Sequence, residues 1–356
     1  QLRSWLDTHF KATGKRKPAA CLGKLRAPTG GQKSEPVYTF KPILGNGSMK
    51  ALIRISTLAV TLVAASAASA ESYYINAADY GVTEFNFTAL GGENVEDQNR
   101  RQECLGVRLE KVLGVPVNMR TAADYAGVLE GFLGGTVDMS ELGASGYARV
   151  FLTDSNAVEP MAVTKQMDGS TGYYSEILVR ADSGIDSFAD LEGRSFYFGD
   201  PDSTSGTLVP TVSFRMMGID PEEYFSEVGF SGGHEQSIVG VYNGDFDASG
   251  TWISGQGNFE DGYTRGGLRR TLDNGLIDIS EMKPIWRSDE IPEGPLTVRQ
   301  ALPTEVKEAV RTSFLNFAEE DPDCMAIYGN EISGYARADH SNYEFIVEMR
   351  RGAFGG

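Results

Sequence analysis

The chain has 356 residues, of which 32 are Lys or Arg and 49 are Asp or Glu, so its net charge is −17 at pH 7. From Glu71 on the chain holds 21 basic and 47 acidic residues, a net charge of −26. A surface this acidic repels phosphate backbones and anionic lipid, which argues against nucleic-acid and membrane-surface partners. The length from Glu71 on suffices for one large domain or two linked lobes.

The first 70 residues do not resemble part of a folded domain. Residues 49–70, MKALIRISTLAVTLVAASAASA, combine two basic residues, an apolar run and a small-residue end, which is the pattern of a secretory signal peptide. The apolar run at 55–65 is too short to cross about 30 Å of hydrocarbon as an anchor. We therefore expect the mature protein to begin at Glu71. Residues 1–48 are basic and contain no Met, and we interpret them as a mis-called upstream extension.

Two cysteines, Cys104 and Cys324, follow the leader, and export would bring them to a compartment where disulfides persist. A bridge and two separately buried thiols are both compatible with the sequence, because the spacing matches no metal or redox motif. The histidines after Glu71 are His234 and His340, which lack metal-ligand spacing. We expect neither a metal nor a cofactor.

Strands and helices alternate along the chain after the leader. Strands are expected at 72–79, 115–122, 194–199 and 227–232, and helices at 98–114, 124–135, 207–218 and 237–244. Residues 304–321 are expected to form an amphipathic helical segment. The alternation predicts an α/β fold with parallel strands.

Two of the expected helical segments each have one apolar face. Four apolar residues of the segment 98–114 recur at helical spacing: Leu105, Leu109, Val112 and Leu113. The segment 304–321 does the same with Val306, Val310, Phe314 and Phe317.

A short internal repeat indicates that the two halves are built alike. Residues 135–140 and 244–249 share the pattern Gly, any residue, apolar residue, Asp, any residue, Ser, each after a short helix. Two similar α/β lobes would explain the repeat. A cleft between two lobes is a usual place for a small ligand.

The segment 200–206, Asp-Pro-Asp-Ser-Thr-Ser-Gly, lies between an expected strand and an expected helix. Its hydroxyls belong to Ser203, Thr204 and Ser205, beside the unpaired N–H groups of a helix start, and this combination suits an anion. The same residue types are also the preferred helix caps, so a capped helix without a ligand fits equally well.

Three more residues are candidate donors to the same anion. His234 follows two glycines at the carboxyl end of an expected strand, where ligands of open α/β sheets bind. Tyr125 at a helix opening and Tyr173 offer phenolic donors. A capping histidine and two core aromatics are the competing interpretations, and no single residue decides between them.

The sequence contains neither the nucleotide-binding motif G-x-x-x-x-G-K-[ST] nor the zinc-binding motif H-E-x-x-H. Ser205, His234 and Asp247 have the residue types of a catalytic triad, but nothing in the sequence places them together. We therefore expect a binding protein rather than an enzyme.

Five segments resemble, in this order, the periplasmic phosphonate-binding proteins of ABC importers: ADYAGVLEGFLGGTVD, DGSTGYYS, GDPDSTSGTLVP, GGHEQSIVGVYNGDFDASGTW and WRSDEIPEGPLTVR. The similarity covers nearly all of the chain from Glu71 to about Pro303. The DPxSTSGxLxP and GHE motifs are specific to the group that binds phosphate, phosphite or phosphonate.

The resemblance implies a type II periplasmic binding protein, with two α/β lobes joined by a two-strand hinge and closing on a ligand. The expected first lobe covers 71–176, the second lobe 177–296, and residues 297–356 return to the first lobe. The implied location is the periplasm. The implied partners are a small phosphorus oxyanion and an ABC permease of the inner membrane, and we expect a monomer or weak dimer.

The resemblance also implies the residues of the binding site. The phosphorus-bound oxygens are expected at four residues: Ser203, Thr204, Ser205 and His234. Tyr125 and Tyr173 are expected to contact the ligand from the other lobe. Two alternatives keep the same fold or site: a protein that presents its ligand to a membrane sensor, and a hydrolase of phosphorus esters.

The sequence departs from the family where the ligand's substituent would lie. Ser254 and Gly294 stand where relatives that bind an aminoalkylphosphonate have acidic residues that meet the ammonium group. With Trp252 close by in sequence, this departure predicts a pocket of Trp252 and Ser254 for a small, uncharged substituent, as in methylphosphonate, phosphite or phosphate. Three acids remain candidates to replace the lost pair from shifted positions: Asp289, Glu290 and Asp261.

Overall fold

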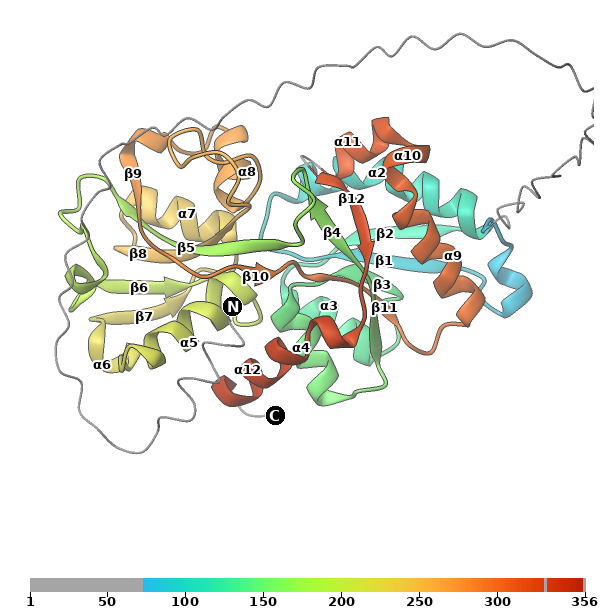
Figure 1. Cartoon of the computed structure of the whole chain (residues 1–356), viewed down its shortest axis with the longest axis horizontal. Coiled ribbons are helices and arrows are strands. Elements are labelled where there is room, and N and C mark those ends of the chain that lie inside the picture. Colours follow the sequence, from blue (N-terminus) through green and yellow to red (C-terminus); the bar gives the residue numbers. More distant parts are fainter. Residues whose placement is uncertain (1–72, 330–331, 355–356) are drawn as a thin grey trace, which may run out of the picture. The chain divides into compact units, whose positions relative to one another are not determined.

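The computed structural model describes residues 73–329 and 332–354 (Figure 1). The expected upstream extension, signal peptide and mature start at Glu71 lie outside the described residues. Within those two ranges, no helix is long and apolar enough to cross a membrane.

The first of two sheets has six strands in the order β12-β4-β11-β3-β1-β2. Their bounds are β1 (Phe85–Ala89), β2 (Val117–Thr121), β3 (Met139–Glu141), β4 (Val158–Gln166), β11 (Pro295–Arg299) and β12 (Ile332–Arg337). The strand β1 runs parallel to β2 and β3, whereas β11 is antiparallel to β3 and β4. We call this sheet and its helices the first lobe.

Helices cover both faces of the first sheet. The helices are α2 (Val95–Leu113), α3 (Tyr125–Leu133), α4 (Ala144–Thr153), α9 (Thr304–Leu315), α10 (Phe317–Glu320), α11 (Pro322–Gly329) and α12 (Glu344–Phe354), with a short 3-10 turn, η6 (His340–Asn342). The predicted apolar faces are confirmed, because all eight residues named for them are buried in one cluster with Phe85 and Phe87 of β1. A second cluster joins α3, α4 and α12.

The second sheet has the strand order β10-β5-β8-β6-β7, and β9 also pairs with β5. Its strands are β5 (Gly172–Arg180), β6 (Ser195–Phe198), β7 (Glu227–Phe230), β8 (Ala248–Ile253), β9 (Met282–Arg287) and β10 (Ile291–Pro292). The helical segments of this second lobe are η3 (Phe188–Leu191), η4 (Thr204–Leu208), α5 (Val209–Met216), α6 (Pro221–Tyr224), α7 (His234–Asn243), α8 (Gly267–Asp273) and η5 (Ile279–Glu281).

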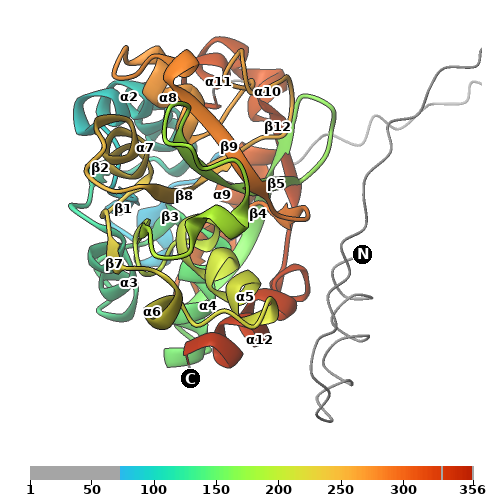
Figure 2. The same ribbon diagram turned by 90° about the vertical axis from the view of Figure 1, so that its left-hand side faces the viewer.

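Alternating side chains of β5 bury both faces of the second sheet. Ile177 packs in the cluster that includes Phe214 of α5, and its neighbour Leu178 packs in the cluster that includes Ile238 of α7. Figures 1 and 2 accordingly show α7 and α8 on one side of this sheet and α5 and α6 on the other. The second lobe is therefore a three-layer α/β unit.

The chain passes between the two sheets twice. Residues 167–171 lead from β4 to β5, and Glu293 and Gly294 lead from β10 back to β11 (Figure 1). The predicted architecture, two α/β lobes joined by two chain segments, is confirmed.

The first expected strand is wrong. Residues 77–80 form a 3-10 turn, η2 (Ala77–Tyr80), and Gly81 ends it in the left-handed conformation at φ 83°. The aromatic and β-branched residues before it resemble a strand, but the Asn76 side chain donates to Asp79 at 3.0 Å and favours a turn. The first strand is instead β1 (Phe85–Ala89), where we expected no strand.

The internal repeat corresponds to matching positions in the two sheets. The Asp138 carboxylate accepts from the backbone N–H of Asn86 on β1 at 2.9 Å. The Asp247 carboxylate accepts in the same way from the backbone N–H of Ser195 on β6, also at 2.9 Å. Each aspartate thus joins the strand that follows it to the neighbouring parallel strand, which supports the inference that the lobes are built alike.

The two cysteines form a disulfide between α2 and α11, with 5.7 Å between the Cα atoms of Cys104 and Cys324. The structure therefore decides between the two alternatives in favour of the bridge. The bridge lies within the first lobe and links α11 covalently to α2.

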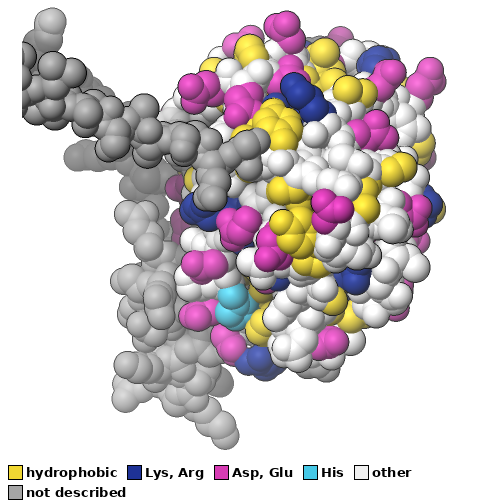
Figure 3. Space-filling model, turned by 90° about the vertical axis from the view of Figure 1, so that its right-hand side faces the viewer, with side chains coloured by type: hydrophobic (Ala, Val, Ile, Leu, Met, Phe, Trp, Pro, Cys, Tyr) yellow, Lys and Arg dark blue, Asp and Glu magenta, His cyan; other side chains and the backbone are white. Residues whose placement is uncertain are grey.

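The surface agrees with an acidic composition. On the face drawn in Figure 3, Asp and Glu side chains are spread among apolar and uncharged ones rather than gathered in one patch. Dispersed negative charge of this kind favours solubility.

Candidate ligand-binding site

A cavity of about 200 Å³ is lined by residues of both lobes. The first lobe contributes residues of β1, α2, α3 and β3 to its wall, and the second lobe contributes residues of β5, η4, α7, β8 and α8. Of the eight residues predicted for the site, seven line this cavity: Tyr125, Tyr173, Ser203, Thr204, Ser205, His234 and Trp252.

Three adjacent hydroxyls lie where β6 is followed by a helix. Ser203 caps η4, because its Oγ accepts from the Gly206 N–H at 3.0 Å, and η4 continues directly into α5. Ser203, Thr204 and Ser205 are each only 2 % exposed. Parallel strands place this turn at the carboxyl edge of the sheet, so the hydroxyls and the N–H groups of the helix start line the same cavity.

Residues 203–205, which we call the hydroxyl turn, accept hydrogen bonds from residues of both lobes. The Thr204 Oγ1 accepts from the backbone N–H of Ser145, the second residue of α4 in the first lobe, at 2.9 Å. The Ser175 hydroxyl of β5 donates to the Ser205 carbonyl at 2.7 Å. These contacts fix the backbone of the turn and connect it to the opposite lobe.

His234 begins α7 and is buried beside the hydroxyl turn. Its Nε2 lies 3.4 Å from the Ser203 Oγ, and its Nδ1 lies 3.4 Å from the Thr251 Oγ1. Burial lowers the pKa of His234 to about 4, and the Glu93 carboxylate only partly opposes this effect. The imidazole is therefore neutral at pH 7, with one ring nitrogen able to donate to an oxyanion.

Two tyrosine hydroxyls lie in the same cavity as the three hydroxyls and His234. Tyr125 begins α3 of the first lobe and lies against Ser203, whereas Tyr173 lies on β5 of the second sheet, directly after the hinge, against Thr204 and Ser205. Burial raises the pKa of both phenols far above neutral pH, so both hydroxyls stay protonated. These six cavity residues therefore offer donors that carry no charge at pH 7.

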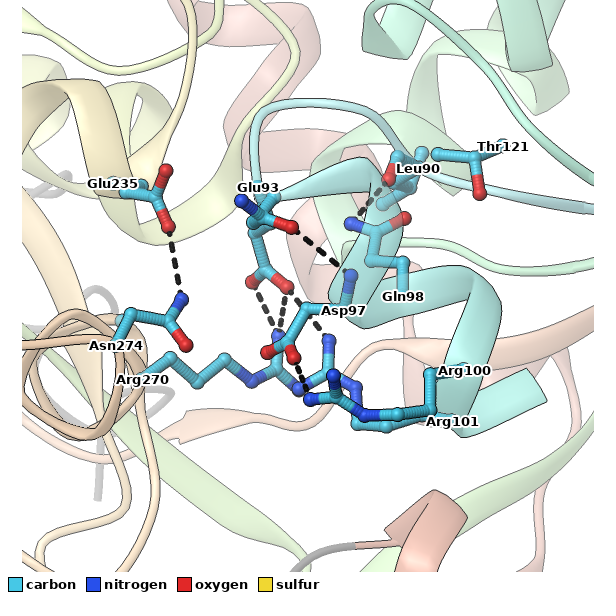
Figure 4. Close-up of polar contacts among 12 residues, drawn as sticks. Leu90, Glu93, Asp97, Gln98, Arg100, Arg101, Thr121, Glu235, Arg270 and Asn274 are labelled. Carbon is cyan, nitrogen blue, oxygen red and sulfur yellow. Dashed lines mark hydrogen bonds and ion pairs between the residues drawn. The ribbon is translucent and has the colours of Figure 1, made fainter.

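An ion-pair cluster joins the lobes beside the donors. Arg270 of α8 donates to both carboxylate oxygens of Glu93, which precedes α2, and Arg101 of α2 lies 3.4 Å from the same carboxylate (Figure 4). Burial alone would raise the pKa of Glu93, but the charges of Arg270 and Arg101 outweigh burial and hold the pKa below its ordinary value. Glu93 is therefore ionised and engaged by an arginine from each lobe.

A second ion-pair cluster joins the lobes beside the hydroxyl turn. Asp202 of the second lobe, 2 % exposed, pairs with Arg149 of α4 and with Arg350 of α12, the latter at 2.7 Å. Arg350 also donates to the Ser145 hydroxyl at 2.7 Å. The C-terminal helix is thereby part of the contact between the lobes.

A family model agrees with this architecture and site. Residues 87–343 match the model described as "ABC transporter, phosphonate, periplasmic substrate-binding protein". The chain belongs to this family. The resemblance inferred from the sequence motifs is therefore confirmed.

Individual relatives of this phosphonate-binding family support the assignment. The chain is 29% identical to the phosphate-import protein PhnD of Mycolicibacterium smegmatis, over 73% of this chain and 81% of the relative. It is 31% identical to the phosphonates-binding periplasmic protein of Escherichia coli, over 66% of each chain. These relatives are named as import or binding proteins, in agreement with the expectation of a binding protein.

Solved structures show the same fold. A binding protein component of an ABC phosphonate transporter from Pseudomonas aeruginosa matches with a TM-score of 0.67 at 25% identity, covering 76% of this chain and 86% of that one. PhnD1 from Prochlorococcus marinus, solved in complex with methylphosphonate, matches with a TM-score of 0.64 at 18% identity, covering 77% of this chain and 99% of that one.

The structure shows where the residues expected near the ligand's substituent lie. Gly294 lines the cavity, and a Cβ atom at this position would lie 1.9 Å from the Leu142 carbonyl oxygen, so no side chain fits there. Ser254 is buried, but it is not among the residues that line the cavity; its Oγ lies 3.2 Å from the Thr264 hydroxyl. Trp252 does line the cavity, edge-on to Tyr173 with 6.1 Å between ring centroids.

The charged part of the wall was missed by the sequence reasoning. None of the three acids proposed as replacements, Asp261, Asp289 and Glu290, lines the cavity. Glu293 does, and it accepts from Arg265 at 2.6 Å, while the Arg265 guanidinium lies 4.9 Å from the Trp252 ring. The available signal was an acid one residue before Gly294, but nothing local to it indicated an arginine partner.

Proposed function

We propose that this protein captures a small phosphorus oxyanion, a phosphonate or phosphite or phosphate, in the cavity between its lobes. The observation that carries the proposal is the convergence of three hydroxyls, a neutral imidazole and two phenols from separate elements in one cavity at a helix start. We assign the phosphorus-bound oxygens to Ser203, Thr204, Ser205 and His234. Tyr125 and Tyr173 close the anion site from α3 and β5.

Uncharged donors suit this ligand in an acidic protein. Fixed N–H and O–H dipoles stabilise an oxyanion without a dedicated arginine clamp. Hydroxyls can also accept a hydrogen bond from a protonated P–OH group, which sulfate lacks near neutral pH. We therefore expect sulfate to bind weakly.

Closure of the lobes would enclose the ligand and create the surface that an ABC permease recognises. The clusters around Glu93 and Asp202 form only while the lobes touch, which supports a closing motion about the two hinge segments. Family membership implies a permease as partner and the periplasm as location, and we place the mature start at Glu71.

A thermal-shift screen tests this function. The protein is mixed in turn with phosphite, phosphate, methylphosphonate, 2-aminoethylphosphonate and sulfate. A ligand at about a hundred times its Kd adds roughly 2.7 kcal/mol of stability, so a true ligand raises the unfolding temperature clearly. We expect a shift with at least one phosphorus anion and a much smaller one with sulfate; equal shifts with sulfate, or none with any phosphorus anion, would contradict the proposal.

A further inference from the structure

Beside the cavity, the two lobes touch through the backbones of two glycines. Gly92 lies in the first lobe between β1 and α2, and Gly233 directly precedes α7 in the second lobe. A Cβ atom at Gly233 would lie 2.5 Å from both the Cα atom and the carbonyl oxygen of Gly92. A Cβ atom at Gly92 would lie 2.9 Å from the Cα atom of Gly233. The backbones therefore approach so closely that neither position has room for a side chain.

The local conformation requires glycine at only one of these positions. Gly92 has φ 87°, in the left-handed region that favours glycine. Gly233 has φ 176° and ψ 179°, an extended conformation that any residue adopts, and it caps α7, a position at which serine is preferred over glycine. Within its own lobe, a Cβ atom at Gly233 would meet only the end of the exposed Gln236 side chain, which can move aside. The reason for glycine at position 233 therefore lies in the opposite lobe.

Both glycines lie in segments that are anchored to their own lobes. The Leu90 carbonyl, two residues before Gly92, accepts from the Nε2 of Gln98 on α2 at 3.0 Å (Figure 4). The Gly233 carbonyl accepts from the Ser237 N–H at 3.0 Å, which is the first backbone hydrogen bond of α7. A side chain at Gly233 would therefore be accommodated by separation of the lobes rather than by a local movement of either segment.

The residue that follows each glycine lines the cavity. Glu93 follows Gly92 and pairs with Arg270 of the second lobe, and His234 follows Gly233 and lies beside the hydroxyl turn. The Glu93 charge acts on the pKa of His234, so the two side chains lie near one another across the boundary between the lobes. The distance between the two glycine backbones therefore sets how closely these cavity residues of opposite lobes approach.

We propose that Gly92 and Gly233 are positioning residues, whose contact is the point at which closure of the lobes ends. The inference rests on the proposed function. With glycine at both positions, the lobes close far enough for Glu93 to pair with Arg270 and for the cavity to enclose its ligand. A side chain at Gly233 would leave the hydroxyl turn and the His234 ring in the second lobe but would keep the first lobe away from them. The bound anion would then stay open to solvent and dissociate faster.

The variant Gly233→Ser tests the inference, because serine keeps the cap of α7 while it adds a side chain. Calorimetric titration with methylphosphonate, phosphite and phosphate measures the affinities, and small-angle X-ray scattering at saturating anion measures closure. We expect the variant to bind at least tenfold more weakly than the wild type and to keep a larger radius of gyration with the anion bound. Its midpoint of urea unfolding without anion should equal that of the wild type. The control Gly352→Ser, in α12, should match the wild type throughout, because a Cβ atom there meets no atom within 4 Å.

A double-mutant cycle with Arg270→Ala distinguishes a defect of closure from damage to the anion site. If the side chain at position 233 keeps Glu93 away from Arg270, removing this arginine from Gly233→Ser should weaken binding by less than about twofold, although it weakens wild-type binding at least fivefold. Wild-type affinity or a wild-type radius of gyration in Gly233→Ser, a lowered urea midpoint, or additive effects in the cycle would overturn the inference while the wild type still binds a phosphorus anion. Binding of none of the three anions by the wild type would overturn the proposed function, and the inference with it.

Discussion

Replacing Ser203 and Ser205 one at a time distinguishes their role in ligand binding from their role in helix capping. Ser203 caps η4 and faces His234, whereas the backbone of Ser205 is held by Ser175 and its hydroxyl faces Tyr173. Each hydroxyl would donate to a charged ligand, a bond worth about 1.5–3 kcal/mol. We therefore expect Ser203→Ala and Ser205→Ala each to weaken binding at least tenfold, about 1.4 kcal/mol.

The stability of the ligand-free protein should distinguish the two variants. Loss of the cap in Ser203→Ala should lower the free energy of unfolding by about 1 kcal/mol, and Ser205→Ala should leave it nearly unchanged. Isothermal titration with the ligand found in the screen measures the affinities, and urea unfolding measures the stabilities. The control Asp220→Ala removes the cap of α6, away from the cavity, and should affect stability alone. Wild-type affinity in Ser203→Ala and in His234→Ala would refute the site assignment.

Three further predictions concern the lobes, the buried histidine and the disulfide. Arg270→Ala removes the second lobe's partner of Glu93 and should weaken ligand binding at least fivefold, about 1 kcal/mol, whereas Arg269→Ala, which removes an ion pair within α8, should not; equal effects in titration would contradict this. The folded-state pKa of His234, about 4, lies below its ordinary 6.5, so unfolding takes up a proton between these values and stability falls as pH falls. Between pH 6.5 and 5 the ligand-free wild type should lose about 1.6 kcal/mol more than His234→Asn in urea unfolding, and parallel losses would refute the neutral buried imidazole. Replacing Cys104 and Cys324 by Ala should lower the free energy of unfolding by about 2–5 kcal/mol and leave ligand affinity at the wild-type value, since the bridge lies outside the cavity wall; an affinity loss would contradict this.

Local sequence patterns predicted most of the fold. The apolar spacing in residues 98–114 identified α2, because a helix that packs on a sheet must repeat its buried residues at helical intervals. The position of the hydroxyl turn was also predictable, because it lies between a strand and the following helix, and this connection comes at the edge of the sheet. The prediction of a strand at 72–79 was wrong because the Asn76–Asp79 hydrogen bond and the left-handed conformation of Gly81 favour a turn in this segment.

The charged wall of the cavity could not be predicted in this way. Glu93 and Arg270 are 177 positions apart, and nothing in either neighbourhood specifies the other. The close packing of Gly294 against the Leu142 carbonyl, which leaves no room for a side chain, likewise appears only in three dimensions.

A crystal structure of the complex with methylphosphonate tests the central claim most directly. The account predicts that the phosphorus lies between the hydroxyls of Ser203, Thr204 and Ser205 and the His234 ring, with phosphorus-bound oxygens within hydrogen-bond distance of these groups. Phosphorus density elsewhere, with the hydroxyl turn unoccupied, would contradict it.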